Sequence, residues 1–178
     1  TSGCSTLENL VVYPHGSAAR RPGSTFLAEV ANSANKTRLI PFEFSTTQTY
    51  MLEFSNLKMR VYKDSGSVLE GDKTISAITK ANPAVVTATS HGYSNGDEVL
   101  ISSVGGMTEV NGKRFLVADK TTNTFELQDK DGVDINSSSF TTYTSGGVSN
   151  KVFELATPYT TAQLFDIKFA QSADVMYI

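Results

Sequence analysis

The feature that most constrains the fold of this chain is a strand pattern that occurs twice, 125 positions apart. In the first copy, residues 42–45 and 50–52 flank a short polar gap. In the second copy, residues 167–170 and 175–177 flank a gap of the same length. Apolar residues alternate with other residues in each arm, which is the period of a half-buried strand. The pattern therefore predicts two similar hairpins separated by an inserted block, an organisation that favours an assembly protein over an enzyme.

Composition favours β structure with a packed core. Of the 178 residues, 39% are hydrophobic and 19% are charged, which argues against disorder. Serine, threonine, valine and glycine are plentiful, whereas helix-forming runs are scarce. The net charge of −3 supplies no global basic field that would attract nucleic acid. No apolar run approaches the roughly 20 residues of a membrane span, and no signal peptide is visible.

Turn residues and alternating runs divide the chain into three parts. The first part contains five expected strands, at residues 7–13, 26–30, 37–44, 49–54 and 58–62. The middle part contains strands at 74–79, 84–88, 98–102, 113–118 and 124–128, with one helical turn at 107–111. The last part contains a strand at 151–155 and a helix at 158–165, before the second copy of the strand pattern. Strands spaced by 8 to 12 residues between glycine, proline and asparagine turns indicate a small barrel or sandwich in the middle part.

The sequence therefore predicts an all-β protein with two domains. Residues 1–71 and 151–178 are expected to form one interrupted β-sheet domain, and residues 72–150 an inserted small β-barrel or sandwich. The inserted block is just long enough to support a core of its own. The chain starts at Thr1 without a methionine and stops at Ile178 inside a strand-like run. We therefore expect it to be the N-terminal part of a longer protein whose next sheet begins at residues 167–178.

An ordered series of short motifs runs through both flanks of the insertion. The motifs are Gly3-Cys4, Leu7-Glu8-Asn9, Pro14-His15-Gly16, Arg20-Arg21-Pro22-Gly23, residues 26–30, 38–42, 50–54 and 59–62, Pro158-Tyr159, and residues 169–178. In this series the chain resembles a family of bacteriophage and prophage tail proteins, related to the tail tubular, or nozzle, proteins of short-tailed phages. The resemblance implies a ring-forming virion component with propeller-like β-sheets.

A second set of motifs lies inside the insertion. They are residues 83–87, His91-Gly92-Tyr93, Gly96-Asp97-Glu98-Val99, Asn111-Gly112, Phe115, Val117, Asn123-Thr124-Phe125 and Ser145-Gly146-Gly147. Here the chain resembles the FCCH-like β modules, which are named after a half-domain of ubiquitin-activating enzymes. The resemblance implies a β fold. It implies no ubiquitin chemistry, because no cysteine lies within residues 72–150.

Candidate catalytic residues are few. His15 and His91 both lie in turn contexts, Pro-His-Gly and Ser-His-Gly, which favours a structural role for each. Cys4, the single cysteine, has no marked base and orienting group beside it and excludes an internal disulfide framework. Asp97 and Glu98 are adjacent on an expected strand and point to opposite faces, which argues against a glycosidase pair. We therefore expect no enzyme activity, no catalytic residues and no cofactor.

Three further sets of residues have a binding and a structural interpretation. Asp129, Asp131 and Asp134 faintly resemble a calcium loop, but the spacing of Gly132 favours a solvated hairpin turn, so no metal site is expected. The basic residues are Arg20, Arg21, Lys36 and Arg38, which contact DNA only if the parent ring lines a channel, and otherwise lie on the surface or against a neighbouring subunit. The aromatic residues are Tyr93 and Tyr143, for which packing in the core or a hairpin is favoured over sugar binding.

The sequence thus predicts a structural component of a phage or prophage tail that assembles non-covalently with other tail subunits. The expected partners are other copies in a homo-oligomeric ring and neighbouring virion proteins. The expected location is the virion, with the bacterial cytoplasm as the site of assembly. The alternative is a host-surface binding module, carried on the tail, that recognises a glycan or a protein receptor.

Overall fold

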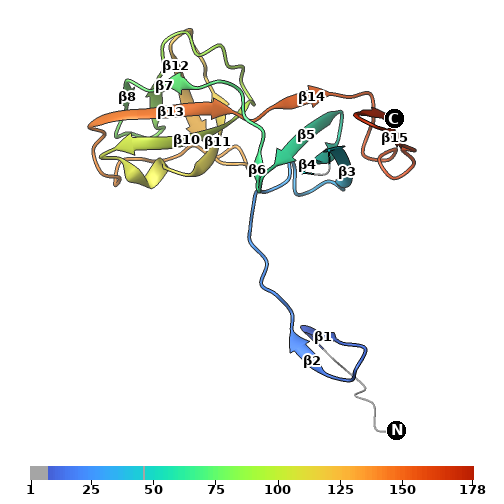
Figure 1. Ribbon diagram of the computed structural model, residues 1–178. Coiled ribbons are helices and arrows are strands. Elements are labelled where there is room, and N and C mark those ends of the chain that lie inside the picture. The colour runs from blue at the N-terminus through green and yellow to red at the C-terminus, as the bar shows by residue number, and fades with distance from the viewer. Residues whose placement is uncertain (1–7, 46) are drawn as a thin grey trace.

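The computed structural model describes residues 8–45 and 47–178, and this part of the chain is built almost entirely of β-strands (Figure 1). Its one helical element is a single 3-10 turn, η1, at Thr108–Val110, which agrees with the turn expected there. The strands fall into one seven-stranded sheet, one five-stranded sheet and two isolated hairpins. Cys4 lies outside the described residues.

The seven-stranded sheet, which we call the module, has the strand order β7-β13-β10-β11-β12-β9-β8. Its strands are β7 (Lys73–Thr74), β8 (Ala77–Ile78), β9 (Val85–Thr87), β10 (Glu98–Gly105), β11 (Lys113–Ala118), β12 (Thr124–Gln128) and β13 (Ser145–Lys151). The two edge strands, β7 and β8, are separated in the chain by only two residues, Ile75 and Ser76. The backbone N–H of Ile75 donates to Gly147 of β13, and that of Ser76 donates to Thr87 of β9. The sheet therefore curls back on itself into a barrel-like module.

Alternation along the strands explains the core of the module. On β11, Phe115 and Val117 are buried while their neighbours are partly exposed, and on β12 Phe125 and Leu127 alternate in the same way. Paired antiparallel strands bring these side chains to the inner face of the curled sheet. The remaining buried apolar members are Ile75, Ile78, Ala84, Val86, Ala88, Tyr93, Val99, Ile101, Val104, Met107 and Val110. The module thus has a hydrophobic core of its own.

The five-stranded sheet, which we call the platform, has the order β14-β5-β4-β3, with β6 paired to β5. Its strands are β3 (Arg38–Ser45), β4 (Gln48–Ser55), β5 (Lys58–Lys63), β6 (Gly66–Ser67) and β14 (Glu154–Ala156). Because β14 pairs with β5, the chain leaves this sheet after β6, builds the module, and returns to the same sheet. The predicted fold class, an all-β chain with an interrupted sheet and an inserted barrel-like module, is therefore confirmed.

The second copy of the strand pattern does not repeat the pairing of the first. In the platform, Phe42 of β3 pairs with Tyr50 of β4. The counterparts of these two residues do not pair, since Val175 of β16 (Val175–Tyr177) lies opposite Ser172 of β15 (Ala170–Ser172). The expected strand at 167–170 is wrong because Ile167 is buried in the platform core instead. A hairpin does follow, but it forms a separate two-stranded sheet.

Two other expected elements are absent from the described residues, and three short strands were missed. The helix expected at 158–165 is a series of turns at 161–166, which nevertheless buries Leu164 in the platform core with Ile40, Leu52 and Phe54. The strand expected at 26–30 is an extended segment without strand partners. The unexpected strands are β2, β6 and β13.

The N-terminal described residues form a small hairpin at the end of an extended segment (Figure 1). Its strands are β1 (Leu10–Val12) and β2 (Ala18–Arg20). We call residues 8–21 the arm. The following residues 26–34, which we call the strap, run along the module and platform and contribute to the contacts described next.

Candidate functional site

A buried ionic cluster joins the platform to the module. Glu98 begins β10 of the module and is 2% exposed, and Arg60 on β5 of the platform is 3% exposed. The Arg60 Nη2 atom lies 2.8 Å from the Glu98 Oε2 atom. Arg114 and Lys130 approach the same carboxylate, with nitrogen-to-oxygen distances of 3.5 Å and 3.4 Å. A buried carboxylate surrounded by three cations fixes the two sheets against each other.

The same arginine also binds the strand by which the chain returns to the platform. The Nε atom of Arg60 donates to Glu154 Oε1 at 2.8 Å, and Lys58 Nζ lies 2.6 Å from Glu154 Oε2. Burial opposes ionisation of Glu154, but Lys58 and Arg60 outweigh it and hold the pKa of this carboxyl below its ordinary value. For Arg60, burial is the largest single effect and works against the charged form, but Glu98, Glu154 and Glu53 together outweigh it, so the pKa of the guanidinium is raised.

A second buried carboxylate anchors the strap to the platform. Glu53 on β4 is 1% exposed and accepts hydrogen bonds from the Tyr62 hydroxyl and from the backbone N–H of Ala31, the latter at 3.0 Å. Burial together with the hydrogen bond to Glu53 raises the pKa of Tyr62 to about 12. From the module side, Lys130 Nζ donates to the carbonyl oxygens of Glu29 and Val30, at 3.2 Å and 3.1 Å. The strap is therefore fixed at adjacent positions by both sheets.

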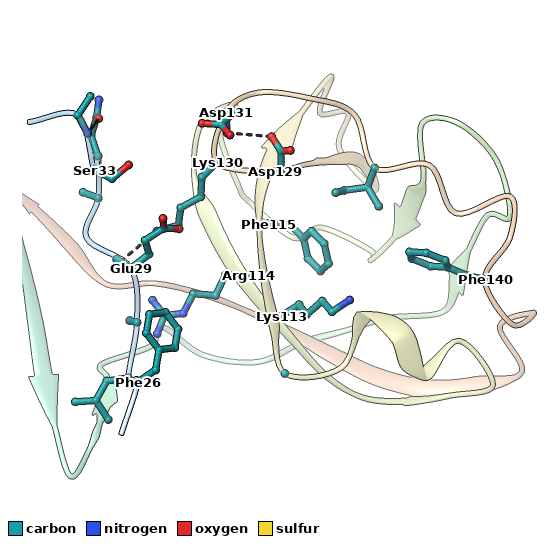
Figure 2. A pocket seen from close by; sticks show the side chains of 17 residues that line it. Phe26, Glu29, Ser33, Lys113, Arg114, Phe115, Asp129, Lys130, Asp131 and Phe140 are labelled. Carbon is teal, nitrogen blue, oxygen red and sulfur yellow. Dashed lines mark hydrogen bonds between the residues drawn. The ribbon is translucent and has the colours of Figure 1, made fainter. Parts of the chain in front are cut away.

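A cavity of about 950 Å³ lies between the strap and the module (Figure 2). The strap supplies Phe26, Leu27 and Glu29 to one wall. The module supplies the opposite wall, which combines aromatic and charged side chains: Lys113, Arg114, Phe115, Asp129, Lys130, Asp131, Ile135 and Phe140. This size and this mixture of apolar side chains with a few polar groups are typical of ligand or peptide sites.

The structure places the two histidines in unrelated settings. His15 is exposed in the turn of the arm. His91 is buried in the module, where its Nδ1 atom accepts the backbone N–H of Tyr93 at 3.0 Å and its ring packs against Tyr93 and Phe125. The turn geometry at Ser90 and Gly92, both with positive φ, accounts for the local sequence. His91 therefore has packing and hydrogen-bond partners that explain it structurally.

The acidic residues considered from the sequence are held in turns and ion pairs. Asp129 accepts the backbone N–H groups of Asp131 and Val133, both at 2.9 Å, and Asp134 accepts the Gln128 side-chain amide at 2.9 Å. Asp97 lies 3.2 Å from Lys151, whereas its neighbour Glu98 belongs to the buried cluster. Among the described residues, no group of three or more histidine, cysteine, aspartate and glutamate side chains is placed to hold a metal ion.

The predicted basic cluster is divided by the structure. Arg20 lies on β2 of the arm, whereas Arg38 lies on β3 of the platform, and Figure 1 shows these strands far apart. Arg38 donates to the carbonyl oxygens of Leu164 and Ile167, both at 2.9 Å, so its guanidinium holds these turn residues against the platform. The four basic residues therefore do not form one patch in this structure.

The two tyrosines pack in the module. Tyr93 is 4% exposed, and its hydroxyl donates to the Ser149 carbonyl at 2.9 Å. Tyr143 packs against the core and donates to the carbonyl oxygens of Ile75 and Gly146. Core packing, the favoured interpretation, is confirmed for both, and the sugar-binding interpretation of exposed rings is wrong for Tyr93.

Comparison with known proteins supports the resemblance of the module. The family model described as the ubiquitin-activating enzyme E1 FCCH domain matches residues 81–152, a stretch that lies almost entirely within the module. The match covers less than half of the chain, and residues 81–152 are therefore similar to a small β domain of that class. None of the curated proteins compared with the chain matches it. In the part of the chain that the structure describes, no helix is long and apolar enough to cross a membrane.

The charged junction is the part of the site that sequence reasoning missed. Arg60 lies in the run Met-Arg-Val and Glu98 in the run Asp-Glu-Val. In an alternating strand, a charged residue at either position is expected to face solvent. No local pattern pairs these residues, because Arg60 lies inside β5 and Glu98 lies well inside the expected insertion of residues 72–150.

Proposed function

We propose that this protein is a structural component of a phage tail that assembles non-covalently with other virion subunits. The observation that carries the proposal is the distribution of exposed large apolar side chains. Among the described residues, all of these except Val133 lie outside residues 72–150. They are Leu10, Val11, Val12, Tyr13, Phe26, Leu27, Leu39, Phe44, Met51, Leu57, Leu155, Phe165, Phe169, Val175, Tyr177 and Ile178.

This distribution separates a self-contained module from incomplete flanks. The module buries nearly all of its large apolar side chains in its own core, whereas the arm, the platform and the β15–β16 hairpin also leave large apolar side chains exposed, even though the platform has a small core. Exposed apolar groups gathered in one part of a protein mark surfaces that other proteins cover. Within residues 8–45 and 47–178, the strands β1, β2, β15 and β16 also each have one edge without a strand partner, and such an edge is a template for pairing with another chain. Both features suit a subunit that neighbouring subunits complete.

The motif series in the flanks agrees with this function, since it resembles tail proteins over the same residues that leave apolar side chains exposed. In this role the chain contributes non-covalent contacts and no chemistry. Its partners are other copies in a ring and adjacent tail proteins, and it reaches the virion after synthesis in the bacterial cytoplasm.

The experiment is mass spectrometry of purified phage particles released by the bacterium that carries the gene. The proposal predicts peptides from residues 8–45 and 151–178 in intact particles, at a copy number above one per particle. A phage from whose genome the gene is deleted should fail to complete its tail, and a plasmid copy of the gene should restore tail assembly. Complete, infectious particles that contain no peptide of this chain would contradict the proposal.

The second candidate function is a host-surface binding module, and the self-contained core of the module favours it. A domain that needs no neighbour to bury its core is able to present its loops at the outside of a particle. The test is a glycan array and a host-cell pull-down with the intact protein. Binding to one glycan class or one surface protein, lost when the loop at 129–134 is replaced, supports this candidate. The structural function predicts no binding in either assay.

A further inference from the structure

The arm exposes an apolar strand that its own chain does not cover. Leu10, Val11, Val12 and Tyr13 are 42%, 43%, 57% and 50% exposed. All of residues 8–27 are exposed apart from Ala19, which is partly exposed. An isolated two-stranded hairpin is marginally stable in water and is stabilised when it packs against a larger surface. The arm therefore needs a docking surface outside itself.

The cavity between the strap and the module has the lining that such an arm requires. Phe115, Ile135 and Phe140 supply apolar surface on the module side, and Phe26 and Leu27 supply it on the strap side. The volume of about 950 Å³ is large enough for several side chains. Figure 2 shows Phe26 on the strap with Arg114 beside it, while the Phe115 ring lies inside the curled sheet, where it also belongs to the module core.

The charges of the arm and the cavity are complementary. Arg20 and Arg21 follow the apolar strand pair of the arm, and neither takes part in an ion pair within the described residues. At the cavity, Glu29 and Asp131 carry carboxylates that make no ion pair in the same part of the chain. The cavity lining also contains Arg114 and Lys130, which pair with Glu98, and Lys113, which makes no ion pair in the described residues. The carboxylates left there, with Asp129 included, outnumber this lysine, so the remaining charge at the cavity is opposite to that of Arg20 and Arg21.

The arm points away from the cavity of its own chain. Figure 1 shows β1 and β2 at the far end of the extended segment that leads to the platform and the module. Only a few residues separate Arg21 at the end of the arm from Phe26 at the cavity wall. This geometry presents the arm to another molecule, and a second copy of the same chain always carries the matching cavity.

We propose that the arm of one copy docks in the cavity between the strap and the module of a second copy. Leu10, Val11 and Val12 would contact the aromatic walls, while Arg20 and Arg21 would pair with the carboxylates at the cavity. The contact uses two different surfaces, so it is heterologous and generates a ring when the rotation between copies closes. The inference deepens the assembly function proposed above and rests on it, because it supposes that copies of the chain meet.

The first test is self-association of the intact protein, measured by sedimentation velocity over a concentration series with Cys4→Ser throughout to exclude disulfide cross-links. The inference predicts that the parent protein self-associates and that Val11→Asp weakens the dissociation constant by about tenfold or more, because a charge replaces a docked apolar group. The matched control is Thr122→Asp, which adds the same charge at an exposed residue in the connection between β11 and β12, outside the arm and the cavity lining. This control should retain the self-association of the parent.

The second test separates a specific contact from general stickiness by exchanging charges. Arg21→Asp and Asp131→Arg should each weaken self-association, because each leaves like charges facing each other across the contact. Combining the two substitutions in one chain restores opposite charges and should recover most of the lost affinity. Circular dichroism of each variant checks that the fold is retained, and all of the substituted side chains lie at exposed or partly exposed positions.

The outcomes distinguish this inference from the proposed function. A parent protein that remains monomeric, or self-association that Val11→Asp and the charge exchange leave unchanged, overturns the docking of the arm. Either result leaves the structural function intact if the chain is present in purified particles. Absence from the particles overturns the structural function, whatever the arm does in solution.

Discussion

Removing Arg60 should destabilise the protein far more than removing its neighbour Lys58, although both contact Glu154. The substitution Arg60→Met keeps the length and apolar stem of the side chain but leaves Glu98 buried with weaker partners. Breaking a buried ion pair costs about 3–5 kcal/mol. Arg114 and Lys130 stay at 3.5 Å and 3.4 Å from the Glu98 carboxylate, so the lower end of that range, about 3 kcal/mol, is expected.

The matched control is Lys58→Met on the same strand. The Lys58 side chain is 47% exposed, and an exposed ion pair contributes at most about 1 kcal/mol. The assay is urea unfolding followed by circular dichroism, with the free energy of unfolding taken from the midpoint and slope. Adding Glu98→Leu to Arg60→Met should recover part of the loss, because the uncompensated buried charge is then removed. Equal effects of the two methionine substitutions, within about 0.5 kcal/mol, would show that the buried cluster does not join the two sheets.

Three further predictions follow from the described contacts. In spectrophotometric titration Tyr62 should ionise near pH 12 rather than 10, and Glu53→Gln should lower that pKa, whereas the pKa of Tyr93, which burial raises, should not change. Because the folded pKa of Tyr62 is raised, its contribution to stability is complete below pH 10 and is lost as the pH rises towards 12. The pKa of Glu154 is lowered, so its contribution to folding stability is complete above pH 4.5 and is lost as the pH falls further. Glu154→Gln should therefore make acid unfolding less steep. Gly147→Ala should cost about 2 kcal/mol more than Gly112→Ala in urea unfolding: both have positive φ, but a Cβ at Gly147 would lie 2.5 Å from a Val104 methyl group, whereas nothing lies within 4 Å at Gly112. Equal losses in this glycine pair would contradict the close packing of β13 on β10.

Local patterns predicted the module well because its strands follow the simplest rule. In β11 and β12, apart from Lys113 at the start of β11, buried apolar residues alternate with partly exposed ones, so the period of two is visible without knowledge of the partner strands. Turn glycines with positive φ, such as Gly96 and Gly112, then come just before the strands β10 and β11 begin. The positions of these elements therefore depend on residues that lie close together in sequence.

Strand β13 was missed because its own sequence does not favour a strand. Residues 145–151 contain two glycines and one apolar side chain, Val148. Gly147 is required because β10 approaches it closely at Val104, and the ladder with β10 supplies the hydrogen bonds. Pairing with β10 stabilises this strand, and a local sequence pattern does not reveal such a partner.

The helix and the strand that were expected in the flanks fail for related reasons. Residues 158–165 bury Leu164 under the platform through turns, and the run is too short to stabilise an isolated helix. The strap alternates like a strand, but no strand in the described part of the chain pairs with it, and the carbonyl groups of Glu29 and Val30 accept hydrogen bonds from Lys130 instead. In both segments, tertiary contacts determine the backbone conformation.

The candidate site combines residues from before and within the insertion, so patterns among neighbouring residues could not predict it. Arg60 and Glu98 are brought together only because β14 returns to β5 after the module is complete. The cavity likewise combines the strap with β11 and the loop after β12. Arg60 comes before the expected insertion and Glu98 lies within it, so no pattern in neighbouring residues relates the two.

Cryo-electron microscopy of purified particles tests the central claim most directly, because it shows whether this chain is part of the tail and how its copies meet. We predict density for the platform and module in repeated copies around the tail axis, with the exposed apolar residues of the flanks covered by neighbouring subunits. A tail in which this chain is absent, or in which those apolar residues of the arm and platform face solvent in every copy, would contradict a structural role built on these surfaces.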